Sequence, residues 1–150
     1  MTNKRQVIPV VGLLCTVGVV GYMVVHLDGQ STAPTGDYRN ASIAEVRDAA
    51  GLIVLRGQFA VPEEEDDDIE RKAALEQTGV DADAAGDAEI EFAKAAPTVQ
   101  EVEFVARNLQ PGATYTFVID GYDIAAATAD RGGEAEVEVE VRLPGASASR

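Results

Sequence analysis

The feature that most constrains the fold is a strict alternation of apolar and polar residues near the C-terminus. From Glu134 to Leu143 every second residue is apolar, and the other positions hold four glutamates and one arginine. Successive side chains of a β-strand point to opposite faces, so this pattern predicts a strand with one buried and one solvated face. The same alternation occurs over Asp87–Phe92 and over residues 101–106. Such strands are typical of antiparallel sheets.

Further short strands are expected at Leu52–Val61, Ile69–Glu76, Thr114–Asp120 and Tyr122–Thr128. The segment Ile43–Ala50 fits either a strand or a short helix, since Ser42 and Glu45 have the spacing of a helix-capping box, and we favour the strand. The pattern therefore predicts an all-β fold, an antiparallel β-sandwich of seven or eight strands.

Turn signals separate these strands. Asp120-Gly121 is a two-residue hairpin signal, because both positions tolerate positive φ. The pattern Asp-x-x-Gly begins at Asp48, Asp83 and Asp130, and it favours a type I turn followed by a left-handed residue. We interpret the three copies as three tight hairpins, although the likeness of residues 83–92 to residues 130–139 also fits a duplication.

An apolar segment of 21 residues, Val7–Leu27, contains no Asp, Glu, Lys or Arg. As a helix it would span roughly 30 Å, enough to cross a bilayer, and Lys4 and Arg5 before it place the N-terminus in the cytoplasm. We predict a single-pass signal anchor in the cell membrane with the domain outside. A cleaved signal peptide, leaving a secreted or periplasmic protein, is the alternative. The expected division is a cytoplasmic stub over 1–6, the membrane helix over 7–27, a flexible linker over 28–41, the β-sandwich over 42–144 and a disordered tail over 145–150.

The chain is strongly acidic, with 26 acids, 12 bases and a formal net charge of −14. The first 27 residues hold two bases and no acid, so the remainder holds 26 acids and ten bases, a net charge of −16. Such a surface repels phosphate backbones, so we expect no nucleic-acid partner. High net charge also simply keeps proteins soluble, and this composition suits a salt-adapted or GC-rich organism.

The stretch LQPGATYTFVI, Leu109–Ile119, resembles the segment that enters the sixth strand of fibronectin type III and related immunoglobulin-like domains. In those families the tyrosine hydrogen-bonds back to nearby backbone, so the resemblance implies a structural role for Tyr115. This chain adds a hairpin after the matching strand. The families serve as spacers, adhesion modules or binding scaffolds, so the resemblance implies an architecture and no activity.

Little in the sequence predicts catalysis. The only histidine, His26, and the only cysteine, Cys15, both lie in the apolar segment, and the chain has no tryptophan. Histidine triads, thiol catalysis and ordinary zinc sites are thereby excluded from the exported part. We predict that the protein is not an enzyme and has no catalytic or cofactor-binding residue.

Calcium is the one cofactor that the sequence suggests. Asp81, Asp83 and Asp87 follow part of the ligand spacing of a calcium loop, with Gly86 at its sixth position, whereas Ala85 and Phe92 stand where ligands are needed. The acidic run over residues 63–68 would also attract divalent cations or a basic partner.

We therefore expect a non-enzymatic, membrane-anchored interaction or structural module of a cell envelope. The alternative is a calcium- or cation-binding envelope domain. Its partners would be the membrane, through the N-terminal helix, and a protein or a divalent cation. Pairing of a partner chain with an exposed strand edge is a further mode of recognition.

Overall fold

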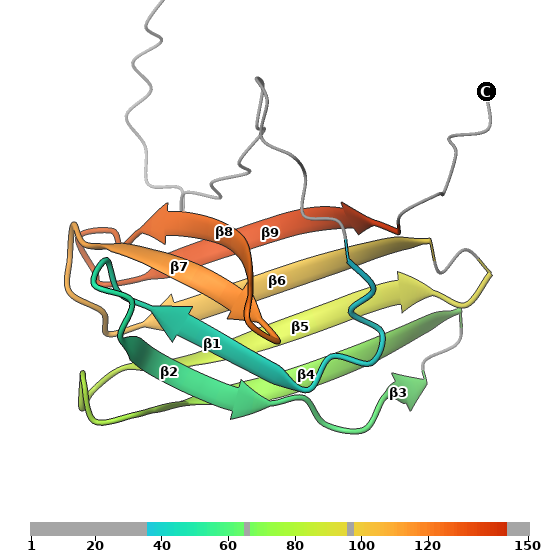
Figure 1. Cartoon of the computed structure of the whole chain (residues 1–150), viewed down its shortest axis with the longest axis horizontal. Coiled ribbons are helices and arrows are strands. Elements are labelled where there is room, and N and C mark those ends of the chain that lie inside the picture. The colour runs from blue at the N-terminus through green and yellow to red at the C-terminus, as the bar shows by residue number, and fades with distance from the viewer. Residues whose placement is uncertain (1–35, 65–66, 96–97, 144–150) are drawn as a thin grey trace, which may run out of the picture.

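The computed structural model describes residues 36–64, 67–95 and 98–143, which form nine strands and no helix long and apolar enough to cross a membrane (Figure 1). The membrane helix predicted over 7–27 and the tail over 145–150 lie outside the described residues. The all-β prediction is confirmed. The strands are β1 Ile43–Arg47, β2 Ile53–Gln58, β3 Glu63–Glu64, β4 Asp68–Gln77, β5 Ala85–Ala93, β6 Val99–Arg107, β7 Thr114–Ile119, β8 Tyr122–Thr128 and β9 Ala135–Arg142.

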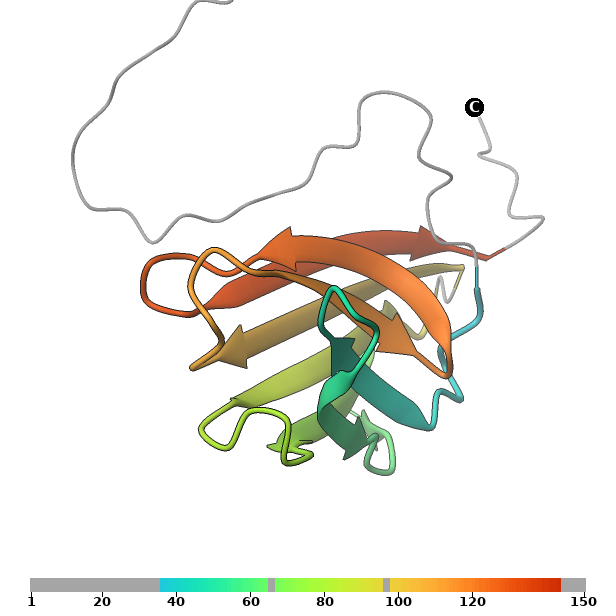
Figure 2. The ribbon, with the colours of Figure 1, turned by 60° about the vertical axis from the view of Figure 1, so that its left-hand side comes forward.

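The strands form one antiparallel sheet in the order β8-β7-β1-β2-β4-β5-β6-β9, with β3 paired beside β4. The sheet curls until its end strands β8 and β9 come into contact, so it makes a nearly closed barrel (Figure 2). After β6 the chain crosses to the free edge of β1, forms the β7-β8 hairpin there, and returns to β6 as β9. Closure of this kind leaves few unpaired strand edges.

The continuous sheet corrects the predicted β-sandwich, which would have two separate sheets. Strands β2 and β4 pair through Leu55↔Gln77 and Arg56↔Glu76, and this short ladder joins what would otherwise be two layers. Alternation predicts which face of a strand is buried, and that face is the same in a sandwich and in a barrel. Pairing between edge strands decides between the two architectures, and alternation carries no information about it.

The barrel interior is filled by side chains from every long strand. In β5, β6 and β9 the predicted inward residues are buried, apart from the half-buried Val139. Phe104 of β6 contacts Phe117 of β7 across the interior, with ring centroids 5.2 Å apart and planes tilted by 57°. Burial of aromatic rings and branched aliphatic side chains is the main stabilisation of such a core.

One end of the barrel is closed by residues 36–41, the described part of the predicted linker. Tyr38 and Ala41 are buried in the core. The Tyr38 amide donates to Oε1 of Gln100 at 2.8 Å, and Nη1 of Arg71 donates to the carbonyls of Arg39 and Ala41 at 3.0 and 2.7 Å. Gln100 and Arg71 are themselves buried, and these bonds satisfy polar groups that would otherwise be costly there.

The predicted Asp-x-x-Gly hairpin at Asp48 is confirmed, since it joins the paired strands β1 and β2. At Asp130 the predicted turn forms, but it joins β8 to β9, which lie at the two ends of the sheet order and share no ladder, so it is not a hairpin. In each turn Oδ1 of the aspartate accepts from the second and fourth following amides, and the glycine, Gly51 or Gly133, has φ near +80°. The predicted Asp120-Gly121 turn is confirmed as well, with both residues at positive φ.

The third hairpin prediction, at Asp83, is wrong. The β4–β5 connection precedes Ala85 and uses Gly79, at φ +97°, as its left-handed residue. Gly86 lies inside β5, where an added Cβ would be 2.5 Å from the carbonyl oxygen of Val105. This glycine therefore permits a close approach of β6 and does not form a turn.

Tyr115 takes the role that its resemblance implies. Its side chain is buried, and its hydroxyl oxygen accepts a hydrogen bond from the amide of Gln110 at 3.0 Å. The bond fixes the loop that leads into β7.

Candidate functional site

The three carboxylates predicted to bind calcium do not share one site. Asp81 and Asp83 lie in the β4–β5 connection, where Oδ1 of Asp81 accepts from the Asp83 amide at 3.4 Å. Asp87 lies within β5 and pairs with Nη1 of Arg107 at 3.1 Å. Within residues 36–64, 67–95 and 98–143, no three His, Cys, Asp or Glu side chains are placed to hold a metal ion. The geometry therefore adds no support to calcium binding here.

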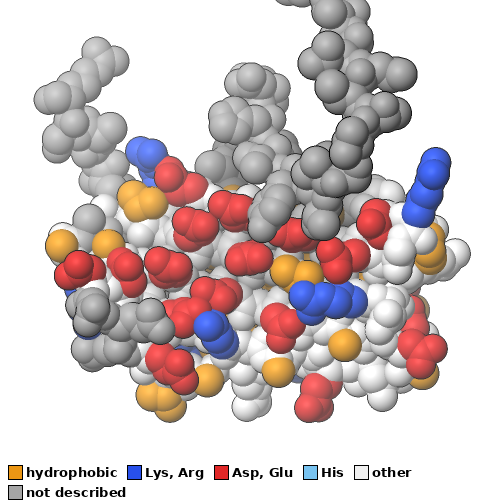
Figure 3. Space-filling view, turned by 180° about the vertical axis from the view of Figure 1, so that it is seen from behind, with side chains coloured by type: hydrophobic (Ala, Val, Ile, Leu, Met, Phe, Trp, Pro, Cys, Tyr) orange, Lys and Arg blue, Asp and Glu red, His pale blue; other side chains and the backbone are white. Residues whose placement is uncertain are grey.

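Acidic residues instead gather on the outer face of four neighbouring strands, β4, β5, β6 and β9, which we name the acidic half (Figure 3). Its outward positions carry eleven acids and three bases, a net charge of −8. The acids are Asp68, Glu70, Glu76, Asp87, Glu89, Glu91, Glu101, Glu103, Glu136, Glu138 and Glu140, and the bases are Lys72, Arg107 and Arg142.

The strand register places like charges directly opposite one another. One row across the four strands consists of Glu70, Glu91, Glu101 and Glu140. The next row consists of Lys72, Glu89, Glu103 and Glu138. Directly opposed side chains of an antiparallel pair lie about 5 Å apart at Cβ, and like charges at that distance destabilise the sheet.

This repulsion is visible in the acid-base properties of the face. Partial burial, the hydrogen bond with Glu70 and the charge of Glu70 together raise the pKa of Glu89 to about 7. Burial and the nearby Glu138 raise the pKa of Glu101, and burial and the nearby Glu103 raise that of Glu136. The ionised face is therefore a state that a cation would stabilise.

The same face is hollowed over β4, β5 and β6. A hollow of about 350 Å³ forms where the short side chains of Ala74 and Val105 lie among the longer ones of Lys72, Glu89 and Glu103. A much smaller hollow, about 20 Å³, lies among four carboxylates: Glu89, Glu91, Glu101 and Glu103.

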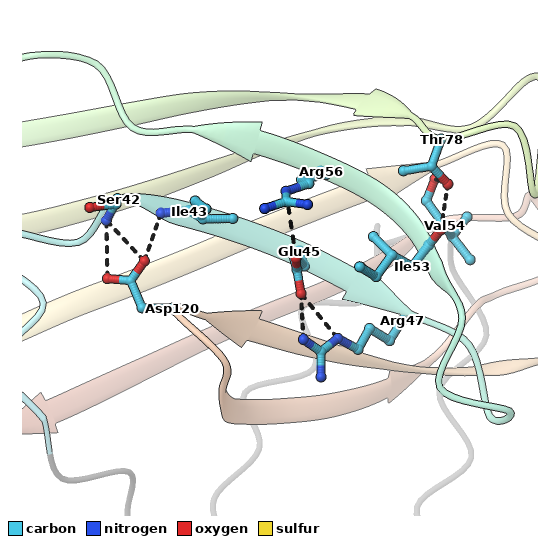
Figure 4. Close-up of polar contacts among 9 residues, drawn as sticks. All are labelled: Ser42, Ile43, Glu45, Arg47, Ile53, Val54, Arg56, Thr78 and Asp120. Carbon is cyan, nitrogen blue, oxygen red and sulfur yellow. Dashed lines mark hydrogen bonds and ion pairs between the residues drawn. The ribbon is translucent and has the colours of Figure 1, made fainter.

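The outer face of β8, β7, β1 and β2, which we name the neutral half, has a different character. Its strands carry two acids and two bases, Glu45, Asp123, Arg47 and Arg56. Glu45 is buried between the two arginines, 2.5 Å from Nη2 of Arg47 and 3.6 Å from Nε of Arg56 (Figure 4). Both arginines of these strands therefore pair with the one buried carboxylate, Glu45.

The acidic half is not among the predicted sites, although the sequence contains a signal for it. Alternating glutamates occur in three of the predicted strands, and each strand was correctly expected to have a wet face. Only the pairing of β4 with β5, β5 with β6 and β6 with β9 brings these faces into one surface.

No protein-family model, curated protein or solved structure matches the chain. Kinship with fibronectin type III and immunoglobulin-like domains stays a prediction.

Proposed function

We propose that the protein is a non-enzymatic interaction module, tethered to the outer side of a cell membrane, whose acidic half binds a basic partner. The observation that supports this most directly is the pair of carboxylate rows in which Glu91 faces Glu101 and Glu89 faces Glu103. Opposed like charges lower the stability of the fold, and a cationic partner would reverse that cost.

The partner that fits this face is an extended basic polypeptide segment. Neighbouring strands lie about 4.8 Å apart, so a row across four strands spans about 14 Å. A single divalent ion neutralises only the carboxylates that touch it, whereas a chain of lysines or arginines can lie along a whole row. Clustered charge of one sign also attracts such a partner from solution.

The tether in this proposal is the predicted helix over 7–27, which would attach the membrane to the barrel through residue 36. Residues 36–41 are bonded to β4 and β6 through Arg71 and Gln100, so the attachment point is part of the folded domain. If the N-terminal segment is cleaved instead, the acidic half is unchanged and the same partner would be bound by a secreted domain.

The test is titration calorimetry of the full-length chain, in a neutral detergent, with a peptide of eight lysines. One variant neutralises four acids of the acidic half: Glu91→Gln, Glu101→Gln, Glu138→Gln and Glu140→Gln. The matched control neutralises four acids elsewhere: Asp67→Asn, Asp81→Asn, Asp83→Asn and Asp123→Asn.

Both variants change the net charge equally, so they separate a local surface from an overall charge. We expect the first to weaken binding by on the order of tenfold and the control to weaken it far less. Binding of the unchanged protein should also weaken as salt is added. Equal weakening in the two variants, or no binding at low salt, would contradict the proposal.

A further inference from the structure

One basic residue of β4 points into the barrel and has no acid beside it. Arg71 is only 8% exposed, and within the described residues no carboxylate lies close enough to form an ion pair with it. Its guanidinium donates to backbone carbonyls alone: Nη1 to those of Arg39 and Ala41, and Nε and Nη2 to that of Ala60 at 3.3 and 3.1 Å. Buried charges in proteins are normally paired with an opposite charge. The positive charge of Arg71 is here solvated by neutral groups only.

The guanidinium of Arg71 also has one donor to spare. A guanidinium carries five N–H groups, and the three carbonyls take four of them. Nη2 makes a single bond, so its second N–H has no acceptor among the described residues. The guanidinium carbon lies 5.6 Å from the centre of the Phe59 ring, which adds a cation–π contact. Because the group is already held in place, a ligand that binds to it pays little for ordering it.

A hollow of about 410 Å³ lies beside this guanidinium. It is lined by residues 39–43, by three residues of the segment 58–62 and by Arg71. No described residue of its lining is acidic, whereas three acids line the hollow over β4, β5 and β6. The lining also contains the polar residues Asn40, Ser42 and Gln58 and the apolar residues Ile43, Phe59 and Pro62.

Two carboxylates are bonded to residues of this lining, and both have partners of their own. Asp37 accepts from Nε and Nη2 of Arg39 at 2.8 and 2.6 Å, so the charge of Arg39 is balanced. Asp120 accepts from the amide of Ser42 at 3.0 and 3.1 Å. Neither aspartate lines the hollow. The uncompensated charge at the hollow is therefore that of Arg71.

We propose that this hollow binds a carboxylate that is attached to a short apolar chain, with Arg71 as the group that binds the charge. The inference goes beyond the proposed function, because it concerns other residues and a ligand of opposite charge. The spare N–H of Nη2 donates to one carboxylate oxygen, and the polar side chains of the lining donate to the other.

The charge of the whole protein narrows the class of ligand. A formal net charge of −14 repels polyanions, so an anion with a single charge enters the hollow at the lowest cost. A short hydrocarbon chain next to the carboxylate would pack against the apolar part of the lining. A free short-chain carboxylic acid and the C-terminus of a peptide both present this group.

The experiment is a titration of the ¹⁵N-labelled full-length chain, in a neutral detergent, with propionate. Propionate replaces chloride, so that the ionic strength stays constant, and propionamide is the uncharged control ligand. We expect propionate to shift the Nε–Hε signal of Arg71 and the amides of residues 39–43 and 58–62 until they saturate, and propionamide to leave them unchanged. Acetylated tri-alanine then tests the source of the carboxylate. Tighter binding than that of propionate identifies a peptide C-terminus, and weaker binding identifies a small free acid.

The variants leave Arg71 in place, because its bonds to the carbonyls of Arg39 and Ala41 also hold the end of the barrel closed. Gln58→Glu adds a carboxylate to the lining, and we expect it to weaken propionate binding by on the order of tenfold. Gln77→Glu makes the same change at an exposed position of β4 outside this hollow and should bind as the unchanged protein does.

Three results would overturn the proposal. They are the absence of saturable shifts with propionate, equal shifts with propionamide, and equal weakening in Gln58→Glu and Gln77→Glu. None of them bears on the acidic half, whose binding of the eight-lysine peptide is measured separately.

Discussion

The two halves of the barrel share one core but differ in the length of their strands and in the regularity of their pairing. Strands of the acidic half are 8–10 residues long and pair without a bulge. Strands of the neutral half are 5–7 residues long, with register shifts between Val46 and Arg47 and between Phe117 and Val118. Bulges bend a strand and interrupt its alternation.

The two outer faces differ in how far their side chains are exposed to solvent. In the acidic half the outward side chains stay at the surface, so their charges are available to a partner. In the neutral half Glu45 and its cross-strand partner Val118 point outward and yet are at most 6% exposed. A regular ladder therefore displays charge, and an irregular one covers it with neighbouring side chains. This contrast is the reason why the proposed binding surface is the acidic half.

The largest expected loss of stability comes from a substitution in the core that the two halves share. Phe104 belongs to the acidic half and Phe117 to the neutral half, and their rings touch. We expect Phe104→Ala to lower the free energy of unfolding by about 3–5 kcal/mol, because it removes buried surface and leaves a cavity. Circular dichroism and tyrosine fluorescence during denaturation should report one shared transition. Two separate transitions would show that the halves fold independently. Val105→Ala, on the outer face of the same strand, is the control and should lower the free energy of unfolding much less.

The two confirmed Asp-x-x-Gly turns give a matched pair. Gly51 lies within the neutral half, between β1 and β2, and Gly133 lies where β8 passes to β9 of the acidic half. Both have φ near +80°, but an added Cβ meets nothing within 4 Å at Gly51 and lies 2.5 Å from the Leu109 carbonyl oxygen at Gly133. Gly51→Ala should cost about 1–2 kcal/mol, from backbone strain alone. Gly133→Ala should cost about 2–4 kcal/mol, and equal melting temperatures would refute the difference.

Removing one charge from each half should change stability with opposite sign. Glu45→Gln weakens charged hydrogen bonds to Arg47 in a buried site, and we expect a loss of about 1–2 kcal/mol. Glu103→Gln removes a carboxylate that faces Glu89 and Glu138, and we expect no loss or a small gain. Urea denaturation at pH 8 measures both, and destabilisation of similar size would show that the charged face is not under repulsion.

The smallest expected effect is on the pH dependence of stability. The pKa of Glu89 is raised when the protein folds, so its contribution is fully present below pH 4.5 and is lost as the pH rises through about 7. Partial exposure limits the change to about 1 kcal/mol between pH 5 and pH 8. The raised pKa values of Glu101 and Glu136 act in the same direction. Hydrogen bonds with Glu89 and Lys72 lower the pKa of Glu70, which acts in the opposite direction.

Glu89→Gln should remove most of this loss of stability between pH 5 and pH 8. At pH 8 the variant should be more stable than the unchanged protein. At lower pH the trend reverses, because hydrogen bonds from the backbone lower the pKa of Asp130 and its stabilisation is lost as the pH falls through that value. Thermal unfolding from pH 3 to pH 8 should therefore show a maximum near pH 5. A melting temperature that rises steadily from pH 5 to pH 8 would contradict the raised pKa of Glu89.

The regular elements could be predicted from the sequence because their causes are local. Alternation predicted β5, β6 and β9, and an aspartate followed three residues later by a glycine predicted the turns at Asp48 and Asp130. Asp83 begins the same pattern, but its glycine, Gly86, is used for close packing against β6, which depends on a residue distant in sequence.

The candidate site could not be predicted for the same reason. The acidic half depends on a register that sets Glu89 opposite Glu103 and Glu103 opposite Glu138, and sequence periodicity does not specify which strands are neighbours. Glu45 lies against Arg47 and Arg56, and the bulge between Val46 and Arg47 beside it has no clear signal in the sequence.

The most direct test of the central claim is to locate the bound partner on one half. Full-length chain labelled with ¹⁵N is titrated with the eight-lysine peptide, and amide chemical shifts are followed residue by residue. Shifts concentrated in β4, β5, β6 and β9 are the predicted result. Shifts concentrated in β1, β2, β7 and β8, or spread evenly over the barrel, would contradict the assignment of binding to the acidic half.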